Sequence, residues 1–381
     1  MILRSDALTA GRADRGRPNF DRDPFVVFWE LTRACDLACE HCRACAQPNR
    51  HRNELTTEQA RALIDDLAGF DRKPVLVVTG GDPMKREDVE EVVGYASERG
   101  LTPAMAASVT PLLTGEALGR LKAAGLRRLA LSLDGADAAT HDGVRRVAGS
   151  FDRTLEAAGA ARAIDLPLQI NTTVMTHNVD QLEAVADLVE RTGAVLWAVF
   201  FLVPVGRGQA SQRIAAEAYE AVFETLWQEA ARRPFSIKTT EAHHWRRFVL
   251  QRKGDPQRGP GEAAAGSGRS GPVQRAPLGV SDGKGCLFIS HTGQVFPSGF
   301  MPCEAGRFPR DSVVTTYRDD ELFRRLRDPE QLKGKCGVCE YRKVCGGSRA
   351  RAFALSGDEM APEPDCVYRP KGWRTPIEAG V

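Results

Sequence analysis

PFVVFWELTRACDLACEHCRAC, residues 24–45, joins an apolar strand to a loop that carries four of the ten cysteines in this 381-residue chain. Its first part, PFVVFWEL (24–31), is rich in the β-branched and aromatic residues that favour a buried strand. After the loop, residues 56–70 predict a helix, because Thr56 and Gln59 are spaced as a capping box. The stretch therefore starts a strand–helix unit, with its cysteines placed directly after the strand.

Five more units of the same kind follow along the chain. Because strands and helices alternate, we expect a parallel sheet, open or rolled into part of a barrel. The predicted fold class is α/β, with a partial (βα)6 TIM barrel over residues 24–210. The further strands are predicted at 74–80, 104–108, 128–134, 166–174 and 194–203, and the helices near 87–99, 114–124, 150–164 and 178–193.

The segments on either side of this barrel differ from it in composition. Residues 1–23 are mostly polar and predict an N-terminal extension. Residues 211–280 predict a connecting segment, in which a helix and a strand are followed by a flexible linker. The helix is expected near 214–231, the strand at 235–240, and the linker over the low-complexity run 254–279.

The C-terminal part predicts a small, cysteine-rich α+β domain at residues 281–381. Within it, CLFISHTGQVFPSGF (286–300) is typical of a β-hairpin that turns at Thr292 and Gly293. The second group of cysteines follows this hairpin and begins after Lys333.

The overall composition argues against several classes of function. The formal net charge is +2, which does not indicate a nucleic-acid partner. No apolar run reaches the roughly 18 residues that a membrane helix needs, and the N-terminus lacks the apolar middle of a signal peptide. We therefore expect a cytoplasmic protein without a membrane partner. There, clustered cysteines indicate metal or redox chemistry rather than disulfides.

The first cysteine group has the spacing C-x3-C-x2-C, formed by Cys35, Cys39 and Cys42. Three thiolates on a tight loop suit a cuboidal iron–sulfur cluster and leave one iron open for a substrate or cofactor. A structural zinc site is the alternative, with Cys45 or His41 as its fourth ligand. The spacing alone leaves both open.

Unusual residues also follow the other predicted strands. The carboxyl ends of parallel strands form the active face of a barrel, so these residues are expected to meet at one mouth. This pattern favours a catalyst over a binding module. The residues concerned are TGGDP (79–83), Ser108, SLDG (132–135), Asn171 and PVGRG (204–208).

Two of these motifs together resemble the radical SAM superfamily. CDLACEHC matches its C-x3-C-x-aromatic-C signature, with His41 at the aromatic position, and TGGDP is similar to its GGEP motif, with Asp82 in place of glutamate. The resemblance implies a 4Fe–4S cluster on Cys35, Cys39 and Cys42. Cys45 is expected to be a small apolar residue outside this ligand set, since a fourth ligand would block the cofactor.

The same resemblance implies a site for S-adenosylmethionine (SAM) at the mouth of the barrel. The reduced cluster would pass one electron into SAM and generate a 5′-deoxyadenosyl radical, which abstracts a hydrogen atom from the substrate. A low-potential donor such as ferredoxin or flavodoxin would supply the electron. The implied cofactor-binding residues are Gly80, Gly81 and Asp82 for the amino group, Ser132 and Asp134 for the ribose or methionine end, Arg145 and Asn171 for the carboxylate and ribose, Val205 and Gly206 for the adenine, and His41 and Ser108 beside them.

The second cysteine group has the spacing C-x2-C-x5-C-x20-C. Four thiols are a complete set for a closed 4Fe–4S cluster or for a structural zinc ion. This tail resembles a SPASM domain, which implies an auxiliary 4Fe–4S cluster on Cys336, Cys339, Cys345 and Cys366.

A further auxiliary cluster is not expected. Cys286 and Cys303 lie where two of its ligands would be, but Ser348 occupies a position that usually supplies another. We expect these two cysteines to be ordinary residues of the hairpin region.

Three segments resemble the radical SAM enzymes of alternative haem and haem d1 synthesis. They are PFVVFWELTRACDLACEHC, FISHTGQVFPSGF and KGKCGVCEYRKVCGGSRARAFALSGD. The resemblance implies oxidative decarboxylation of propionate side chains on an iron tetrapyrrole. The alternatives are a maturase of a ribosomally made peptide and a non-enzymatic zinc or iron–sulfur protein.

Several basic residues could serve such a substrate. Arg349, Arg351 and FRRLR (323–327) could neutralise propionates, and His243 and His244 could approach a haem iron. The alternatives are solvated or helix-end arginines and a plain helix start at the two histidines.

Overall fold

A computed structural model of the chain describes residues 19–252 and 279–374. The predicted linker at 254–279, except its last residue, and residues 1–18 of the predicted extension lie outside the described residues. The strands are β1 (Val26–Thr32), β2 (Val75–Gly80), β3 (Thr102–Ala106), β4 (Leu129–Ser132), β5 (Leu168–Val174), β6 (Leu196–Phe201), β7 (Ser236–Thr240), β8 (Cys286–Ile289), β9 (Gln294–Phe296) and β10 (Gly306–Arg307). The helices are α1 (Thr57–Leu67), α2 (Val89–Glu98), α3 (Gly115–Ala124), α4 (Ala138–Arg145), α5 (Ser150–Ala163), α6 (Leu182–Thr192), α7 (Ala218–Arg232), α8 (Trp245–Gln251), α10 (Val313–Asp319), α11 (Glu321–Arg327), α12 (Gly334–Gly337) and α13 (Arg349–Ser356).

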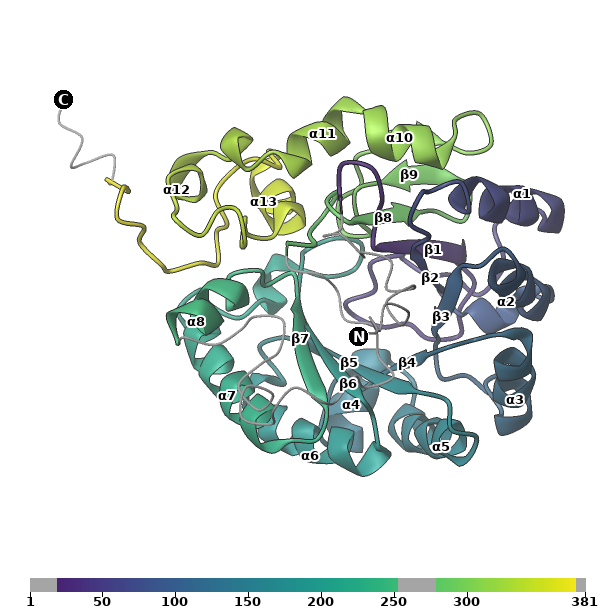
Figure 1. Cartoon of the computed structure of the whole chain (residues 1–381). Helices are drawn as coiled ribbons and strands as arrows, with labels where there is room; N and C mark the ends of the chain where they lie inside the picture. Colours follow the sequence, from purple (N-terminus) through teal and green to yellow (C-terminus); the bar gives the residue numbers. More distant parts are fainter. Residues whose placement is uncertain (1–18, 253–278, 375–381) are drawn as a thin grey trace, which may run out of the picture.

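The strands form one sheet in the order β10-β9-β8-β1-β2-β3-β4-β5-β6-β7, and the run from β8 to β7 is parallel. Helices α1 to α3 and α5 to α8 form an outer arc around the strands (Figure 1). All six predicted strands are present as neighbours in chain order. The α/β partial barrel is therefore confirmed, and the capping box of Thr56 and Gln59 is present at α1.

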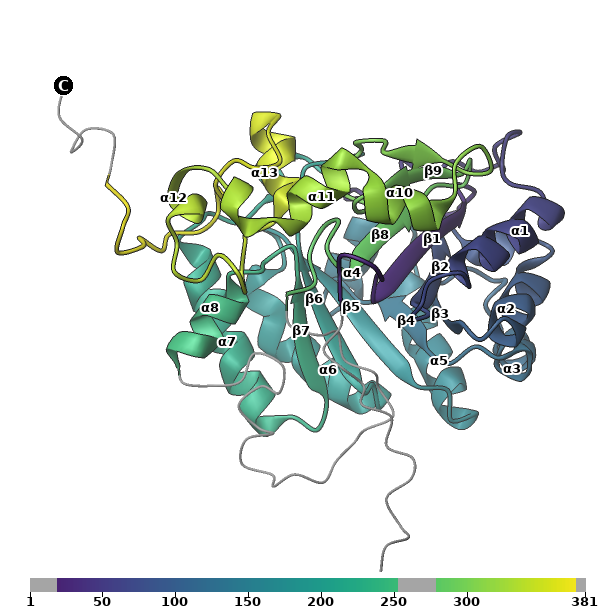
Figure 2. The same cartoon turned by 45° about the horizontal axis from the view of Figure 1, so that its top comes forward.

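The sheet also takes strands from outside the range 24–210. β7 pairs with β6, and β8 pairs in parallel with β1, so that Cys286 lies opposite Val26. β8 and β9 form the predicted antiparallel hairpin. Helices α10 to α13 follow it and lie in a row along one side of the barrel (Figure 2). The division into a barrel and a C-terminal domain at 281–381 stays a prediction, because one sheet runs through both.

Side chains of the strands alternate between the helices and the interior of the barrel. In β1, Val27 and Trp29 are fully buried against the helices, whereas Val26 and Phe28 line an interior cavity. Large branched residues usually fill such an interior. Here Ala104, Ala130 and Ser132 are among the residues that face it, and a cavity of about 2300 Å³ remains. None of the described helices combines the length and the apolar character that crossing a bilayer requires.

Candidate active site

The cavity gathers most of the residues predicted to bind the cluster and SAM. They come from the loop after β1, from the carboxyl ends of β2 to β4 or just beyond them, from within β5 and, for Arg145, from the end of α4. The convergence predicted from the strand order is present for the features that follow β1 to β5. The predicted residues that line the cavity are Cys35, Cys39, His41, Cys42, Gly80, Gly81, Ser108, Ser132, Arg145 and Asn171.

The three cysteine sulfurs of the first group receive hydrogen-bond donors from the protein. Cys35 Sγ accepts from the backbone N–H of Leu37 at 3.4 Å and lies 3.4 Å from Ser108 Oγ. Cys42 Sγ accepts from the backbone N–H of Ala46 at 3.4 Å. Such donors stabilise thiolates and tune the potential of iron–sulfur clusters.

Cys39 receives its donor from a buried ion pair. Arg145 Nη1 lies 3.6 Å from Cys39 Sγ, and Arg145 Nη2 pairs with Asp134 Oδ2. Asp134 Oδ1 accepts from the backbone N–H of Thr173 at 2.7 Å. The carboxylate of Asp134 is thus held by the protein, and Arg145 presents its charge to the cluster loop.

His41 faces the same ion pair. Its Nε2 lies 3.6 Å from Asp134 Oδ2. Burial lowers the pKa of His41 to about 4, despite the opposing effect of Asp134, so the ring is neutral near pH 7. A neutral ring beside the cysteines places no extra charge on the cluster.

The glycine pair after β2 allows the cysteine loop to approach very closely. A Cβ on Gly81 would lie 2.4 Å from the carbonyl oxygen of Ala34, and one on Gly80 would lie 2.3 Å from that of Thr32. Gly80 also has φ +146°, which side-chain-bearing residues rarely adopt. Backbone hydrogen bonds of 2.8 Å from Gly81 to Thr32 and 2.7 Å from Asp82 to Ala34 lock the two segments together.

The side chain of Asp82 points into this turn and does not line the cavity. Its carboxylate accepts from the backbone N–H of Met84 at 3.1 Å and from Thr110 Oγ1 at 2.7 Å. Burial raises its pKa. The contact with the amino group of SAM stays a prediction for Gly80, Gly81 and Asp82, of which Gly80 and Gly81 line the cavity.

Val205 and Gly206 are absent from the cavity lining. Gly206 lies against the carbonyl groups of Cys42 and Arg43 in the cysteine loop, and Val205 packs against a separate apolar cluster. The sequence analysis missed their neighbour Arg207, which holds this loop. Its Nε donates to the carbonyl of Cys39 at 2.9 Å, and its Nη1 donates to that of Ala46 at 3.2 Å. The glycines that flank Arg207 in PVGRG were the available signal. Asn171 lines the cavity, where its Oδ1 accepts from Gln169 Nε2 at 2.7 Å.

The residues around the first cysteine group fit an iron–sulfur cluster. No set of three or more His, Cys, Asp and Glu side chains in the described ranges is arranged around one metal ion. A cuboidal cluster instead takes each thiolate at a different iron. Three cysteines outside disulfides, each with a hydrogen-bond donor, match the ligands that such a cluster needs. Their loop is seated against Gly80 and Gly81, which we call the glycine cradle.

Gly81→Ala is expected to lower SAM cleavage by about 100-fold, because the new methyl group would push the cysteine loop out of place. Iron content and 5′-deoxyadenosine formation after anaerobic reconstitution measure the effect. Gly119→Ala in α3 is the matched control, since a Cβ there meets no atom within 4 Å. Equal activity of the two variants would contradict this role of the cradle.

The second cysteine group lines one small cavity of about 30 Å³. Cys336, Cys339, Cys345 and Cys366 all contribute to its wall, together with His244. Cys336 Sγ accepts from the backbone N–H of Glu363 at 3.3 Å, and Cys345 Sγ accepts from that of Gly347 at 3.4 Å. The four cysteines thus line one cavity, and their role as ligands of one auxiliary cluster stays a prediction.

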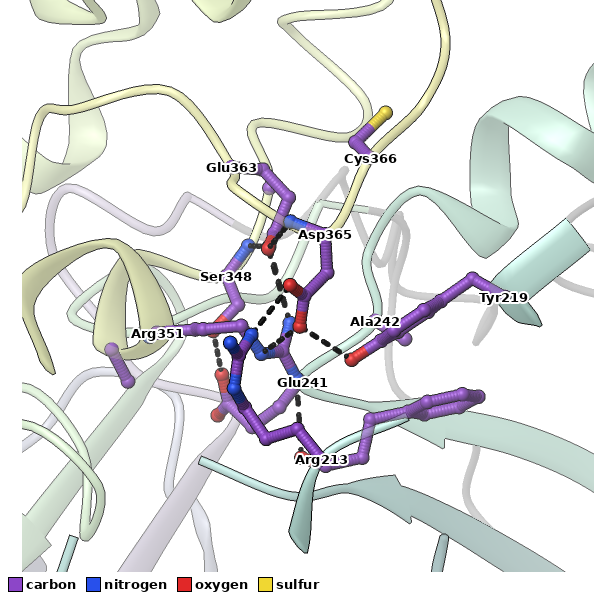
Figure 3. Close-up of polar contacts among 12 residues, drawn as sticks. Arg213, Tyr219, Glu241, Ala242, Ser348, Arg351, Glu363, Asp365 and Cys366 are labelled. Carbon is purple, nitrogen blue, oxygen red and sulfur yellow. Dashed lines mark hydrogen bonds and ion pairs between the residues drawn. The ribbon is translucent and has the colours of Figure 1, made fainter. Parts of the chain in front are cut away.

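A buried polar network lies beside this site (Figure 3). Arg351 is completely buried and pairs with Glu363 at 3.2 Å and with Asp365 at 3.1 Å. Ser348 caps α13, and its backbone N–H donates to Glu363 Oε2 at 2.6 Å while its hydroxyl donates to Glu241. Ser348, which occupies the position of a potential cluster ligand, is therefore a structural residue of this network.

The arginines proposed to neutralise propionates bind other residues of the protein. None of them lines the large cavity. Arg351 pairs with the buried carboxylates of Glu363 and Asp365. Arg349 donates to the carbonyls of Glu359 and Ala361, and Arg325 pairs with Glu359. Arg327 donates to the carbonyl of Tyr317. The structure therefore favours the alternative, in which these arginines bind other parts of the protein.

The two histidines before α8 line different cavities. His243 lines the large cavity, whereas His244 lines the small cysteine cavity and packs against Tyr219 and Phe223. Cys286 also lines the large cavity, and Cys303 packs in a separate apolar cluster.

Comparison with known proteins identifies the family. The profile described as "Radical SAM superfamily" matches residues 29–189. The AdoMet-dependent heme synthase of Methanosarcina barkeri (strain Fusaro / DSM 804) is 40% identical over 347 residues, which cover 91% of this chain and 97% of that protein. The mycofactocin maturase MftC of Mycolicibacterium smegmatis is 32% identical and covers 93% and 84%.

Among solved structures, that of Streptococcus suis SuiB bound to S-adenosylmethionine has a TM-score of 0.68 at 14% identity, covering 94% of this chain and 77% of that one. This likeness supports the fold. The sequence similarity to the heme synthase, over almost the whole of both chains, also shows the family and the class of enzyme. The chain belongs to the radical SAM superfamily and is an iron–sulfur-dependent enzyme that uses SAM.

Proposed function

We propose that this enzyme converts propionate side chains of an iron tetrapyrrole by oxidative decarboxylation. The observation that carries the proposal is the cavity of about 2300 Å³, which begins at the cluster cysteines and extends through the barrel. Such a volume suits a large, rigid substrate. The near full-length similarity to a relative named AdoMet-dependent heme synthase points to the same substrate class.

When bound, the cluster and SAM supply a 5′-deoxyadenosyl radical that removes a hydrogen atom from the propionate. Loss of CO2 then leaves a vinyl group and releases one electron to a one-electron acceptor. Cys35, Cys39 and Cys42 hold the cluster, and Arg145 stabilises the thiolate of Cys39. The glycine cradle fixes the loop, so the reacting side chain can be held close to it and away from water.

We assign an auxiliary 4Fe–4S cluster to Cys336, Cys339, Cys345 and Cys366. A low-potential ferredoxin or flavodoxin is the electron donor that this chemistry needs. None of the ten cysteines forms a disulfide, and a reducing, cytoplasmic location is part of the proposal.

The test uses the anaerobically reconstituted enzyme with SAM, dithionite and iron-coproporphyrin III. Mass spectrometry follows the porphyrin and 5′-deoxyadenosine together. Loss of a propionate carboxylate matched by 5′-deoxyadenosine is the expected result. If 5′-deoxyadenosine forms while the porphyrin stays intact, the tetrapyrrole is the wrong substrate, and a short peptide takes its place.

His243 is expected to bind the iron of this substrate. Its ring lines the cavity, and neither ring nitrogen forms a hydrogen bond with a described residue. Burial, aided by Arg246 and Arg349, lowers its pKa well below the usual value, so a lone pair is free. His243→Ala should weaken binding of iron-coproporphyrin by at least about tenfold and abolish the Soret shift on binding.

Two controls accompany this variant. His51→Ala changes a histidine outside the cavity lining and should bind like the wild type. Metal-free coproporphyrin has no iron to ligate and should bind both variants equally. An unchanged Soret shift in His243→Ala would remove the proposed ligand.

A further inference from the structure

Two basic residues of the cavity wall lack a partner. Arg128 precedes β4 and Lys238 lies in β7, and both are half-buried residues that line the cavity. Neither forms an ion pair or a side-chain hydrogen bond with any residue in the ranges 19–252 and 279–374. An unpaired charge away from bulk water is costly, so such positions are rare unless a ligand completes them.

The other charged groups of the wall have partners, apart from Arg72, which is exposed. Among its acids, Glu190 pairs with Arg233 and Asp23 with Arg318, while Asp282 accepts from the backbone N–H groups of Arg349 and Ala350. Glu241, the remaining acid, is bonded to Ser348, and burial raises its pKa. The basic residues Arg43, Arg145 and Arg246 have a carboxylate or carbonyl partner, in Glu30, Asp134 and Val344 respectively. Arg128 and Lys238 are thus the two half-buried cations of the wall that have no partner among the described residues.

Arg128 and Lys238 act on one another. Burial and, as a smaller cause, the charge of Arg128 together lower the pKa of Lys238 to about 8. Two cations that repel each other in an enclosed space are both stabilised by an anion placed between them. A carboxylate has the charge and the oxygen lone pairs for this position.

The pair lies away from the cysteines. Arg128, Ala130 and Ser132 follow one another on the inward face, and Ser132 ends β4 near the cluster loop. Four residues of strand separate Arg128 from Ser132 by roughly 13 Å. A rigid substrate with carboxylates on opposite edges can therefore offer one edge to the cluster and the other to these cations.

We propose that Arg128 and Lys238 bind the carboxylate side chains of the substrate that do not react. This assignment rests on the proposed function, since it takes an iron tetrapyrrole with several propionates as the ligand. Binding of these carboxylates explains how the enzyme orients a nearly symmetric tetrapyrrole ring. Holding the distant carboxylates fixes which propionate reaches the cluster.

The experiment compares binding of iron-coproporphyrin III with binding of its tetramethyl ester, in which every carboxylate is neutral. The wild type should prefer the free acid. Arg128→Met and Lys238→Met should each weaken binding of the free acid by about 10- to 100-fold and leave binding of the ester unchanged. Lys238→Arg retains the charge and should restore the preference for the acid.

Lys122→Met is the matched control, because it removes one positive charge from exposed α3, outside the cavity. It should bind both porphyrins like the wild type. The proposal is overturned if Arg128→Met and Lys238→Met bind the acid as tightly as the wild type, or lose acid and ester alike. If the variants give either of these results while the wild type still decarboxylates the porphyrin, the proposed function holds and only the carboxylate-binding role of Arg128 and Lys238 is lost. Failure of the wild type to bind either porphyrin overturns both.

Discussion

Cys42→Ala is expected to abolish reductive cleavage of SAM, with a loss of more than about 100-fold in 5′-deoxyadenosine formation. Removing a mere outer-shell partner of a metal ligand costs about 10- to 100-fold, so removal of a ligand has to cost more. Cys42 lines the cavity, and its sulfur accepts from the backbone N–H of Ala46. The measurement is 5′-deoxyadenosine after anaerobic reconstitution and dithionite reduction, with iron counted in the same sample.

Cys45→Ala is the matched control for this loss. Cys45 lies three residues further along the same loop, and it is exposed and absent from the cavity wall. Its substitution should leave both iron content and SAM cleavage at the wild-type level. If Cys45→Ala lost as much activity as Cys42→Ala, the three-ligand assignment would be wrong, and Cys45 would belong to the ligand set.

The sequence predicted the site best where its residues follow directly from the order of strands along the chain. Strand ends carry much of the site, so the chain order of strands was enough to predict that Cys35, Gly81, Ser108 and Ser132 meet. α4 was missed because its eight residues include Gly143 and Thr140, which are poor helix formers. Asp137, whose side chain caps α4 by accepting from the N–H of Thr140, was the signal available.

Contacts between distant segments could not be predicted in the same way. Arg351 looks like one of several basic residues in CGGSRAR, and only the fold brings Glu363 and Asp365 to it. Lys238 alternates with apolar residues in a strand, which equally suits a surface position. It is the curvature of the sheet, with β7 and β8 added to the six predicted strands, that turns Lys238 toward the cavity.

Arg351→Met is expected to destabilise the protein by about 3–5 kcal/mol, because it leaves the buried carboxylate of Glu363 without its cation and removes one of the two arginines that pair with Asp365. Burial alone would lower the pKa of Arg351, but Glu363, Tyr219 and Asp365 raise it above the usual value, so the wild-type side chain stays charged. Glu363 and Asp365 lie three residues and one residue before Cys366, and the backbone N–H of Glu363 donates to Cys336 Sγ. The substitution should therefore also loosen the second cysteine site.

Two measurements separate these effects from general unfolding. Denaturant unfolding gives the loss of stability, and iron content in a background without Cys35, Cys39 and Cys42 reports the second cysteine site alone. Arg324→Met is the control, since Arg324 is exposed and pairs only with exposed Asp319 at 3.2 Å, an interaction worth at most about 1 kcal/mol. Arg351→Met should lose iron from the second site before the barrel unfolds. If it loses stability yet keeps that iron, the network supports the fold without holding the Cys366 loop.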